Sequence, residues 1–158
     1  MKILIGDIGN TLTKLCVVSE MSNIVKEYNI ETVKISKEKN LIKFLKPILK
    51  TKIKKKILLS SVVPKVYKKI NKFLATKNYH VYEIKNLPLK KLIKIRVDKY
   101  SQLGSDRIAN AIGAYSLYKK NCLIVDFGTA TTFDIVRKPG VYEGGVIAPG
   151  IKLSIMNL

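Results

Sequence analysis

Hydrophobic and polar residues alternate along the first part of the chain, as they do in strands that bury one face. The alternation runs through residues 2–9, 11–19 and 23–35, and turn-forming residues interrupt it near positions 6–10 and 19–22. We therefore expect three strands joined by turns, which can pair antiparallel as a meander.

Helical spacing then alternates with short apolar runs. Apolar residues recur at three- and four-residue intervals within 41–49 and 66–74, and strand-like runs follow at 57–63 and 80–84. Strands separated by helices pair in parallel, so the pattern predicts a mixed sheet covered by helices.

A further helix is expected over residues 106–118, after a strand-like run at 92–97. Ser105 is placed to cap it, and Asp106 would lie in its first turn, where unpaired amides favour a carboxylate. The candidates for its packed face are Ile108, Ala111, Ile112, Tyr115 and Leu117 or Tyr118.

An internal repeat is the most informative feature of the chain. The segments LIGDIGNTLTKLCV (4–17) and LIVDFGTATTFDIV (123–136) superpose without a gap, at an offset of 126 − 7 = 119 residues. The superposition sets Asp7 on Asp126, Gly9 on Gly128, Thr13 on Thr132 and Val17 on Val136. So long an offset indicates two similar domains in tandem. We expect a first α/β domain over 1–118 and the first strands of an incomplete second domain over 119–158.

Each copy of the repeat places Asp, Gly and then Asn or Thr residues at a turn between apolar strands. Glycine lets backbone amides approach a ligand closely, hydroxyl and amide groups suit phosphate oxygens, and a carboxylate suits a cation. One such turn is a common hairpin turn, but two matched copies favour a phosphate-binding pair, with Asp7 and Asp126 facing one another across one triphosphate. The chain has no GxxxxGK[ST] or GxGxxG motif, which argues against a P-loop or a dinucleotide site.

The composition limits the remaining classes. The 158 residues hold 30 Lys+Arg against 11 Asp+Glu, a net charge of +19, but 47% are hydrophobic, which excludes a disordered polycation. Nearly all the basic residues are lysines spread through every segment, whereas specific nucleic-acid readout relies on arginine. We therefore interpret them as solvated positions and expect no nucleic-acid partner, with a nucleic-acid or anionic membrane surface as the alternatives.

Cysteine usage and the termini bear on location. Cys16 and Cys122 stand in apolar runs without metal-ligand spacing, and such buried thiols are typical of a reducing compartment. No signal peptide or membrane segment is evident in the sequence. These features predict a cytoplasmic protein without a membrane partner.

Five motifs in series resemble one family. They are DIGNTLTK (7–14), SSVVP (60–64), LGSDRIANAIGAY (103–115), DFGTATTFDIV (126–136) and YEGGVIAPGIKLS (142–154). Their order and spacing are similar to those of type III pantothenate kinase, in the superfamily of acetate and sugar kinases, heat-shock chaperone ATPases and actin. The resemblance implies a duplicated actin-like (ribonuclease H-like) α/β fold and ATP-dependent phosphorylation of pantothenate, the first step of coenzyme A synthesis. It also implies a homodimer at full length.

The resemblance further implies roles for individual residues. The ATP-binding residues would be Asp7, Ile8, Gly9, Asn10, Thr11, Leu12, Thr13, Lys14 and Thr129. Asp7 would also lie near Mg²⁺, and Asp126 would bind a monovalent cation, K⁺ or NH₄⁺. The residues that meet pantothenate would be Gly104, Ser105, Asp106 and Arg107. Asp106 would accept the proton of the attacking hydroxyl and Arg107 would clamp the substrate carboxylate, roles that suit a reaction governed by positioning and charge neutralisation.

The chain departs from the family pattern in three ways, and two other functions stay open. Val97 stands where the family commonly has a substrate-contacting Tyr, and a Pro before Leu103 is absent. Family members are also longer, so we expect the chain to be an N-terminal portion, and whether this portion is active by itself stays open.

One alternative is a non-catalytic relative that acts as an accessory transcription regulator through its basic surface. The other is an ATPase of the actin or chaperone type without a small-molecule acceptor.

Overall fold

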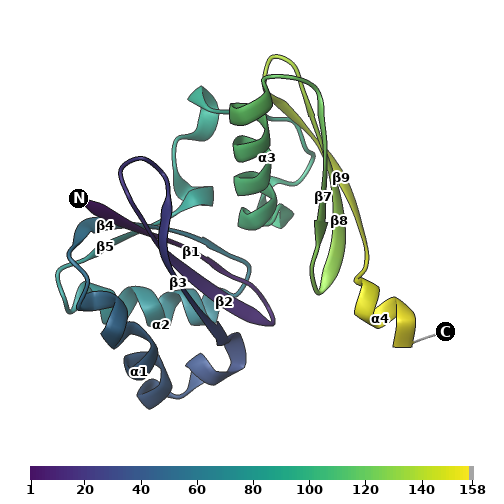
Figure 1. The fold of residues 1–158 in the computed structure, drawn as a ribbon. Helices are drawn as coiled ribbons and strands as arrows, with labels where there is room; N and C mark the ends of the chain where they lie inside the picture. Colours follow the sequence, from purple (N-terminus) through teal and green to yellow (C-terminus); the bar gives the residue numbers. More distant parts are fainter. Residues whose placement is uncertain (157–158) are drawn as a thin grey trace. The chain divides into compact units, whose positions relative to one another are not determined.

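The computed structural model describes residues 1–156, which fold as two compact units. The first unit is Met1–Asn86 and the second begins at Leu87 (Figure 1). Each unit is built around its own sheet. Among residues 1–156, no helix is long and apolar enough to cross a bilayer.

The first unit follows the order that the sequence pattern predicts. Its elements are β1 (Lys2–Ile8), β2 (Leu12–Val18), β3 (Ile24–Glu31), a 3₁₀ helix (Thr32–Ser36), α1 (Glu38–Leu49), β4 (Ile53–Ser61), α2 (Pro64–Ala75), β5 (His80–Glu83) and a 3₁₀ turn (Ile84–Asn86). The third predicted strand is too long, because the chain turns into the 3₁₀ helix after Glu31. Pro64 is the first residue of α2, a position where its missing N–H costs no helical hydrogen bond.

The sheet of the first unit has the order β3-β2-β1-β4-β5. β1 pairs antiparallel with β2, and β2 with β3, whereas β1–β4 and β4–β5 are parallel. The predicted combination of an antiparallel meander and parallel crossover strands is therefore confirmed.

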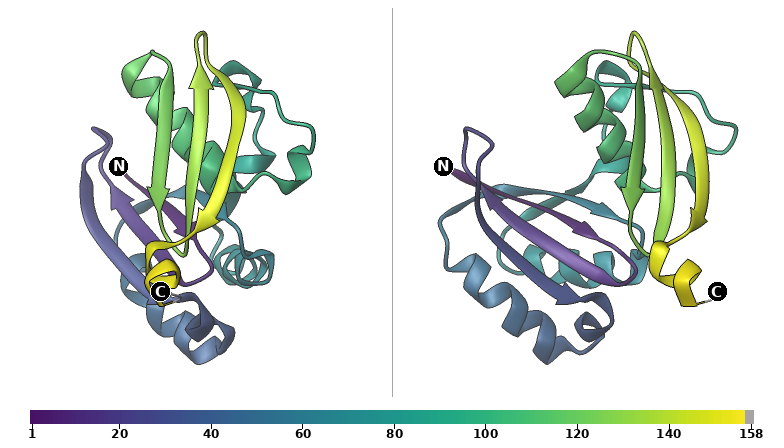
Figure 2. Two further views of the ribbon diagram at one scale, coloured as in Figure 1. Left: turned by 90° about the vertical axis from the view of Figure 1, so that its right-hand side faces the viewer. Right: turned by 45° about the vertical axis from the view of Figure 1, so that its right-hand side comes forward.

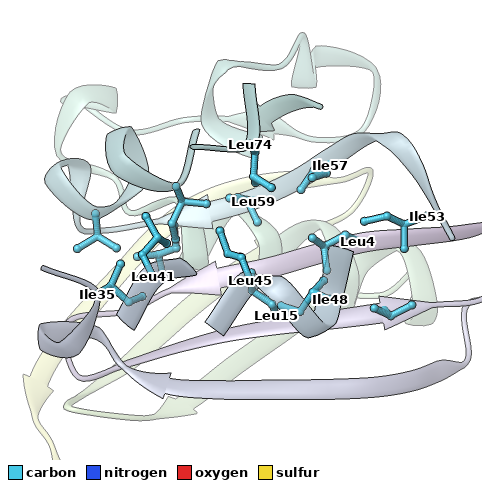
Figure 3. Packing of buried hydrophobic residues seen from close by; sticks show 14 residues of the cluster. Leu4, Leu15, Ile35, Leu41, Leu45, Ile48, Ile53, Ile57, Leu59 and Leu74 are labelled. Carbon is cyan, nitrogen blue, oxygen red and sulfur yellow. The ribbon is translucent and has the colours of Figure 1, made fainter. Parts of the chain in front are cut away.

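One face of this sheet carries the hydrophobic core. Both helices lie against the same face (Figure 2), because each has an apolar stripe at helical spacing. Figure 3 shows Leu4 and Leu15 of the sheet packed with Leu45 and Ile48 of α1. Asp7 points to the opposite face of the sheet, which α1 and α2 do not cover.

The second unit repeats the meander with different surroundings. Its elements are a 3₁₀ turn (Leu89–Lys91), β6 (Lys94–Ile95), a 3₁₀ turn (Tyr100–Gln102), α3 (Ser105–Tyr118), β7 (Cys122–Phe127), β8 (Ala130–Arg137), β9 (Val141–Pro149) and α4 (Ile151–Met156). The strand order is β6-β9-β8-β7, with β7–β8 and β8–β9 antiparallel and β6–β9 parallel. The predicted strand at 92–97 is thus reduced to two residues.

The two hairpins of the repeat correspond, but not without a gap. β1 and β2 are joined by Gly9, Asn10 and Thr11, whereas β7 and β8 are joined only by Gly128 and Thr129. Ile8 therefore pairs with Thr13, while its equivalent Phe127 pairs with Thr131. The gap-free superposition is wrong beyond the turn, since the shorter second turn shifts β8 by one residue, so that Thr13 matches Thr131 rather than Thr132, and Val17 matches Ile135 rather than Val136.

This shift identifies an uncovered apolar face on the second sheet. Leu4, Ile8, Leu15 and Val17 are buried beneath the helices of the first unit. By strand pairing their equivalents are Leu123, Phe127, Phe133 and Ile135, and all four are exposed. We call these four residues the open apolar face. α3 packs instead against the other side of β7 and β8, where Asn110 contacts Asp126.

The contacts of α3 also bear on the domain division. The helix precedes residue 119, but it packs against strands of the second sheet. The compact units thus divide between Asn86 and Leu87, and the division of a duplicated pair into 1–118 and 119–158 stays a prediction.

Three local predictions need correction. Gly104, not Ser105, occupies the N-cap position of α3, because the helix already begins at Ser105, whose side chain is buried. Leu117 and Tyr118 at the end of α3 are exposed rather than packed. Cys16 and Cys122 are free thiols but only half-buried, because each lies on a sheet face that is only partly covered.

Candidate functional site

The first hairpin brings a carboxylate beside hydrogen-bonding side chains. Asp7 pairs in register with Lys14 on β2 and with Ser60 on β4. Ser60 Oγ is buried and has no hydrogen-bond partner within residues 1–156. A buried hydroxyl in that state suits a ligand or an ordered water. The carboxylate and this hydroxyl fit a hydrated Mg²⁺, which proteins hold through few carboxylates together with substrate phosphates.

The turn of this hairpin is tight and presents its polar groups to solvent. The Gly9 amide donates to the Leu12 carbonyl oxygen at 3.1 Å, and a Cβ on Gly9 would lie only 3.0 Å from the same oxygen. Asn10, Thr11 and Lys14 are exposed. All three residues lie at the surface of the turn, where an anion could approach them.

Other predicted ATP-binding residues are engaged in holding the turn. Ile8 is buried in the core, so only its backbone can face a ligand, and Leu12 is half-buried. The Thr13 hydroxyl lies 2.9 Å from the Thr32 hydroxyl, which donates to the Gly9 carbonyl at 2.7 Å. These contacts tie the turn to the segment after β3.

In the second unit, the start of α3 presents adjacent acidic and basic side chains. Asp106 Oδ1 accepts a hydrogen bond from the Arg107 amide at 2.8 Å, and Gly104 precedes the helix as its N-cap residue. The positive end of the helix dipole stabilises a carboxylate at this position. Asp106 is therefore a carboxylate of fixed orientation in the first turn of α3.

Arg107 is held by a buried carboxylate that our sequence analysis missed. Its Nε and Nη2 donate to Asp134 Oδ1 at 2.9 and 2.6 Å, and Tyr142 Oη donates to the same oxygen at 2.5 Å. Asp134 is fully buried. The sequence does indicate that Asp134 is unusual, because an Asp within the apolar strand sequence TTFDIV can be buried only beside a polar or charged partner. Which residue is that partner depends on the fold.

Burial and charge shift the pKa values of both donors. Burial alone would lower the pKa of Arg107, but its hydrogen bond to Asp134 and the carboxylate charge outweigh burial and raise it. Burial raises the pKa of Tyr142, and its hydrogen bond to Asp134 raises it further. Arg107 thus stays a cation and Tyr142 a neutral donor at physiological pH.

A hollow of about 390 Å³ opens beside this group within the second unit. Its lining includes Arg107, Tyr142, Gly144 and Gly145, together with Val97 and Gln102. Val97, at the position where the family resemblance leads us to expect a Tyr, lines this hollow. Asp98, Lys99, Leu103 and Ile147 complete the lining, so the hollow offers two cations, one carboxylate and several apolar side chains. Such a wall suits a small molecule with one anionic group and an apolar body.

The second hairpin also carries polar groups close to its turn. Asp126 Oδ2 accepts from Asn110 Nδ2 at 2.8 Å. Thr132, its partner in register, has a buried Oγ1 without a hydrogen-bond partner in the described part of the chain. Oxygen ligands of this kind fit a monovalent cation. Thr129 is exposed in the turn, and a Cβ on Gly150 would collide with the Thr129 carbonyl oxygen.

The predicted site residues thus gather in two places. The structure brings Asp106, Arg107 and Asp126 together around α3 and the second sheet, while residues 7–14 form the turn of the first unit. Over residues 1–156, no group of three His, Cys, Asp or Glu side chains is arranged to hold a metal ion by itself. The meeting of Asp7 and Asp126 across one triphosphate stays a prediction.

Comparison with known proteins gives a consistent answer. The family model described as type III pantothenate kinase matches residues 3–158. Curated proteins with that name include those of Pelagibacter ubique, 48% identical over 99% of this chain, and Fervidobacterium nodosum, 35% identical over 99%. The chain spans 62% of the length of each. Neither name supports the accessory transcription regulator.

Solved structures support the fold. The activator of 2-hydroxyisocaproyl-CoA dehydratase from Clostridium difficile, with bound ADPNP, matches 94% of this chain and 46% of its own with a TM-score of 0.51 at 14% identity. A reductive activator for a corrinoid, iron-sulfur protein matches 94% of this chain and 31% of its own with a TM-score of 0.50 at 13% identity. The predicted duplicated actin-like α/β fold is therefore confirmed.

Proposed function

This chain belongs to the type III pantothenate kinase family, and we propose that the whole protein transfers the γ-phosphoryl group of ATP to the primary hydroxyl of pantothenate. The product is 4′-phosphopantothenate, and the reaction is the first step of coenzyme A synthesis. Because the chain spans 62% of its relatives' length, the proposal concerns the protein as a whole.

The observation that carries the proposal is the position of Arg107. It follows Asp106 directly at the start of α3 and lines the hollow of about 390 Å³. A fixed guanidinium matches the carboxylate of pantothenate, and its neighbour Asp106 supplies a base for the hydroxyl at the other end. Gly104 and Ser105 would contribute the backbone around the same end of the substrate.

Asp106 would act as the general base. Phosphoryl transfer depends mostly on positioning and charge neutralisation, so the carboxylate orients the attacking hydroxyl and takes its proton late in the reaction. The Arg107 amide holds Asp106 Oδ1 at 2.8 Å, which fixes the direction of the carboxylate at the start of the helix. Asp106 takes the hydroxyl proton as the new O–P bond forms and the bond between the γ-phosphorus and the bridging oxygen of ATP breaks, which releases ADP.

The first hairpin would bind the phosphates of ATP. The amide of Asn10, the hydroxyl of Thr11 and the ammonium of Lys14 are exposed donors at its turn, and backbone groups of Ile8, Gly9, Leu12 and Thr13 complete the loop. Thr129 on the second hairpin would add a contact to ATP. Asp7 would hold Mg²⁺, which neutralises phosphate charge when it is bound.

Three finer properties complete the proposal. Asp126, oriented by Asn110, would bind K⁺ or NH₄⁺. The whole protein would be a homodimer, as the family resemblance implies. Its two free thiols suit the reducing cytoplasm, where its soluble substrates are found.

A coupled assay tests the proposal. ADP release is measured with ATP, Mg²⁺ and K⁺, with and without pantothenate, and the Pelagibacter ubique relative serves as the positive control. A kinase releases ADP only when pantothenate is present. Release that ignores pantothenate identifies an ATPase without an acceptor, and DNA retention that falls steeply with salt identifies a nucleic-acid binder; either result overturns the proposal.

A further inference from the structure

Asp134 is a buried charge that the proposed reaction does not use. It is fully buried, and one of its oxygens, Oδ1, accepts all three hydrogen bonds from Arg107 and Tyr142. Its other oxygen, Oδ2, is buried without a partner in the part of the chain that the structure describes. Burying a carboxylate in this way costs free energy, and an apolar residue of similar size would avoid that cost. Stability alone therefore does not explain its presence.

The geometry shows what the Asp134 carboxylate does to Arg107. Asp134 takes the Nε and Nη2 side of the Arg107 guanidinium, so the plane of that group is fixed. The Arg107 side chain is only 12% exposed, yet it lines the hollow. Nη1 takes no part in the hydrogen bonds to Asp134. A ligand in the hollow would therefore meet a guanidinium whose orientation Asp134 has already fixed.

The backbone of β9 leaves room for this arrangement. A Cβ on Gly145 would lie 2.8 Å from Arg107 Nη2 and 2.8 Å from Asp134 Oδ1, and it would collide with the Phe133 carbonyl oxygen. Only glycine therefore permits the close approach of the guanidinium and carboxylate to the strand. Tyr142, two strand positions behind Gly144, fixes the carboxylate from the same strand.

We propose that Asp134, supported by Tyr142, is a positioning residue that fixes Arg107 to select acceptors bearing a carboxylate. This inference rests on the proposed function, because it assigns to the same hollow the basis of its acceptor selectivity. Asp134 acts through Arg107 and touches neither substrate nor reacting atoms.

The test compares two ligands that differ only in the group that Arg107 would bind. Pantothenol has a hydroxymethyl group in place of the pantothenate carboxylate and is otherwise identical. Dissociation constants for both are measured by NMR titration of the chain, for the wild type and for Asp134→Asn, Asp134→Glu and Tyr142→Phe. Glu27→Gln, an exposed carboxylate change on β3, is the matched control.

The expected readout is the ratio of the two dissociation constants. The wild type and Glu27→Gln bind pantothenate about 10- to 100-fold more tightly than pantothenol, as expected for a hydrogen-bonded charge pair. Asp134→Asn brings the ratio close to unity and removes the downfield Nε–H resonance that the Arg107 hydrogen bond to Asp134 produces, whereas Asp134→Glu restores part of the ratio. Tyr142→Phe, which keeps the buried pair, lowers the ratio about threefold.

The possible failures are distinct. A wild type that does not distinguish the two ligands overturns the proposed acceptor site itself. A wild type that prefers pantothenate, with a preference that Asp134→Asn retains, overturns only the positioning role. If Asp134→Asn does not fold, an unchanged ratio in Tyr142→Phe overturns it. Equal weakening of both ligands indicates a merely structural residue and also overturns it.

Discussion

The hydroxyl groups of Thr13 and Thr32 lie 2.9 Å apart, although 19 positions separate them in the sequence. Thr32 also donates to the Gly9 carbonyl, so the turn of the first hairpin is fixed by the residue that follows β3. The proposed phosphate-binding loop, residues 7–14, thus depends on a contact with Thr32, which lies outside the DIGNTLTK motif.

Replacing either threonine by valine will destabilise the first unit. Thr32→Val removes both hydrogen bonds and leaves the Thr13 hydroxyl buried, so we expect a loss of about 1–3 kcal/mol in the free energy of unfolding, with a smaller loss of about 1 kcal/mol for Thr13→Val. Urea denaturation of the two single variants and the double variant measures the coupling. Strict additivity of the two losses would contradict the bridge.

Asp106→Asn will lower pantothenate-dependent ADP release by about 10²- to 10⁴-fold, because the amide cannot take the hydroxyl proton. ATP binding, followed by fluorescence titration, will stay within about twofold of wild type, since the proposed phosphate loop is unchanged. Glu27→Gln removes an exposed carboxylate of β3 and serves as the control. An active Asp106→Asn variant would exclude this residue as the base.

Asp126→Asn will raise the K⁺ concentration needed for half-maximal activity by about tenfold or more, because the ligand charge is lost. Asn110→Ala, which removes the hydrogen bond to Asp126, will have a smaller effect in the same direction. Activity is measured over a range of KCl at constant ionic strength. Equal activity without K⁺ or NH₄⁺ would contradict a cation at this residue.

Tyr142 will make the stability of the second unit depend on alkaline pH. Its pKa is raised by burial and by Asp134, whereas the phenol of the unfolded chain ionises near pH 10. The contribution is therefore complete below about pH 10 and decreases above it, as the unfolded chain loses its proton first. Between pH 8 and about 11, the midpoint temperature of thermal unfolding will fall less steeply in Tyr142→Phe than in wild type. Tyr118→Phe, at an exposed tyrosine, will leave the slope unchanged.

The open apolar face will bind a hydrophobic dye. Leu123, at 66% exposure, lies on this face of the second sheet, whereas Leu117, at 78%, lies on α3. Leu123→Lys will therefore reduce the fluorescence of the bound dye several-fold, and Leu117→Lys will change it little. Equal effects of the two substitutions would show that the dye does not report on the sheet.

Much of this arrangement is predictable because it depends on local patterns. The three-strand meander, α1, α2 and the parallel strands follow from hydrophobic spacing, and Asp106 is recognisable beside Arg107 at a helix start. The third predicted strand is longer than the observed one, because the alternation continues beyond Glu31 while the chain turns so that the Thr32 hydroxyl reaches the Gly9 carbonyl.

The remainder depends on distant contacts. A gap-free repeat is the simplest match of two sequences, and only hydrogen-bond pairing shows that the second turn is one residue shorter. Asp134 is likewise visible as a polar residue in an apolar strand, but its partner Arg107 is 27 positions earlier. Sequence spacing does not specify which helix covers that strand face.

The hollow beside Arg107 is lined entirely by residues between Val97 and Ile147, whereas the loop of residues 7–14 is part of a separately packed unit. Point mutations in one continuous stretch of the gene can therefore remodel this wall while the earlier turn is inherited intact. Sequence differences among relatives at Val97 would change the lining of the hollow without changing residues 7–14. A chimaera that exchanges the segment from Leu87 onward between relatives would transfer the whole lining of the hollow.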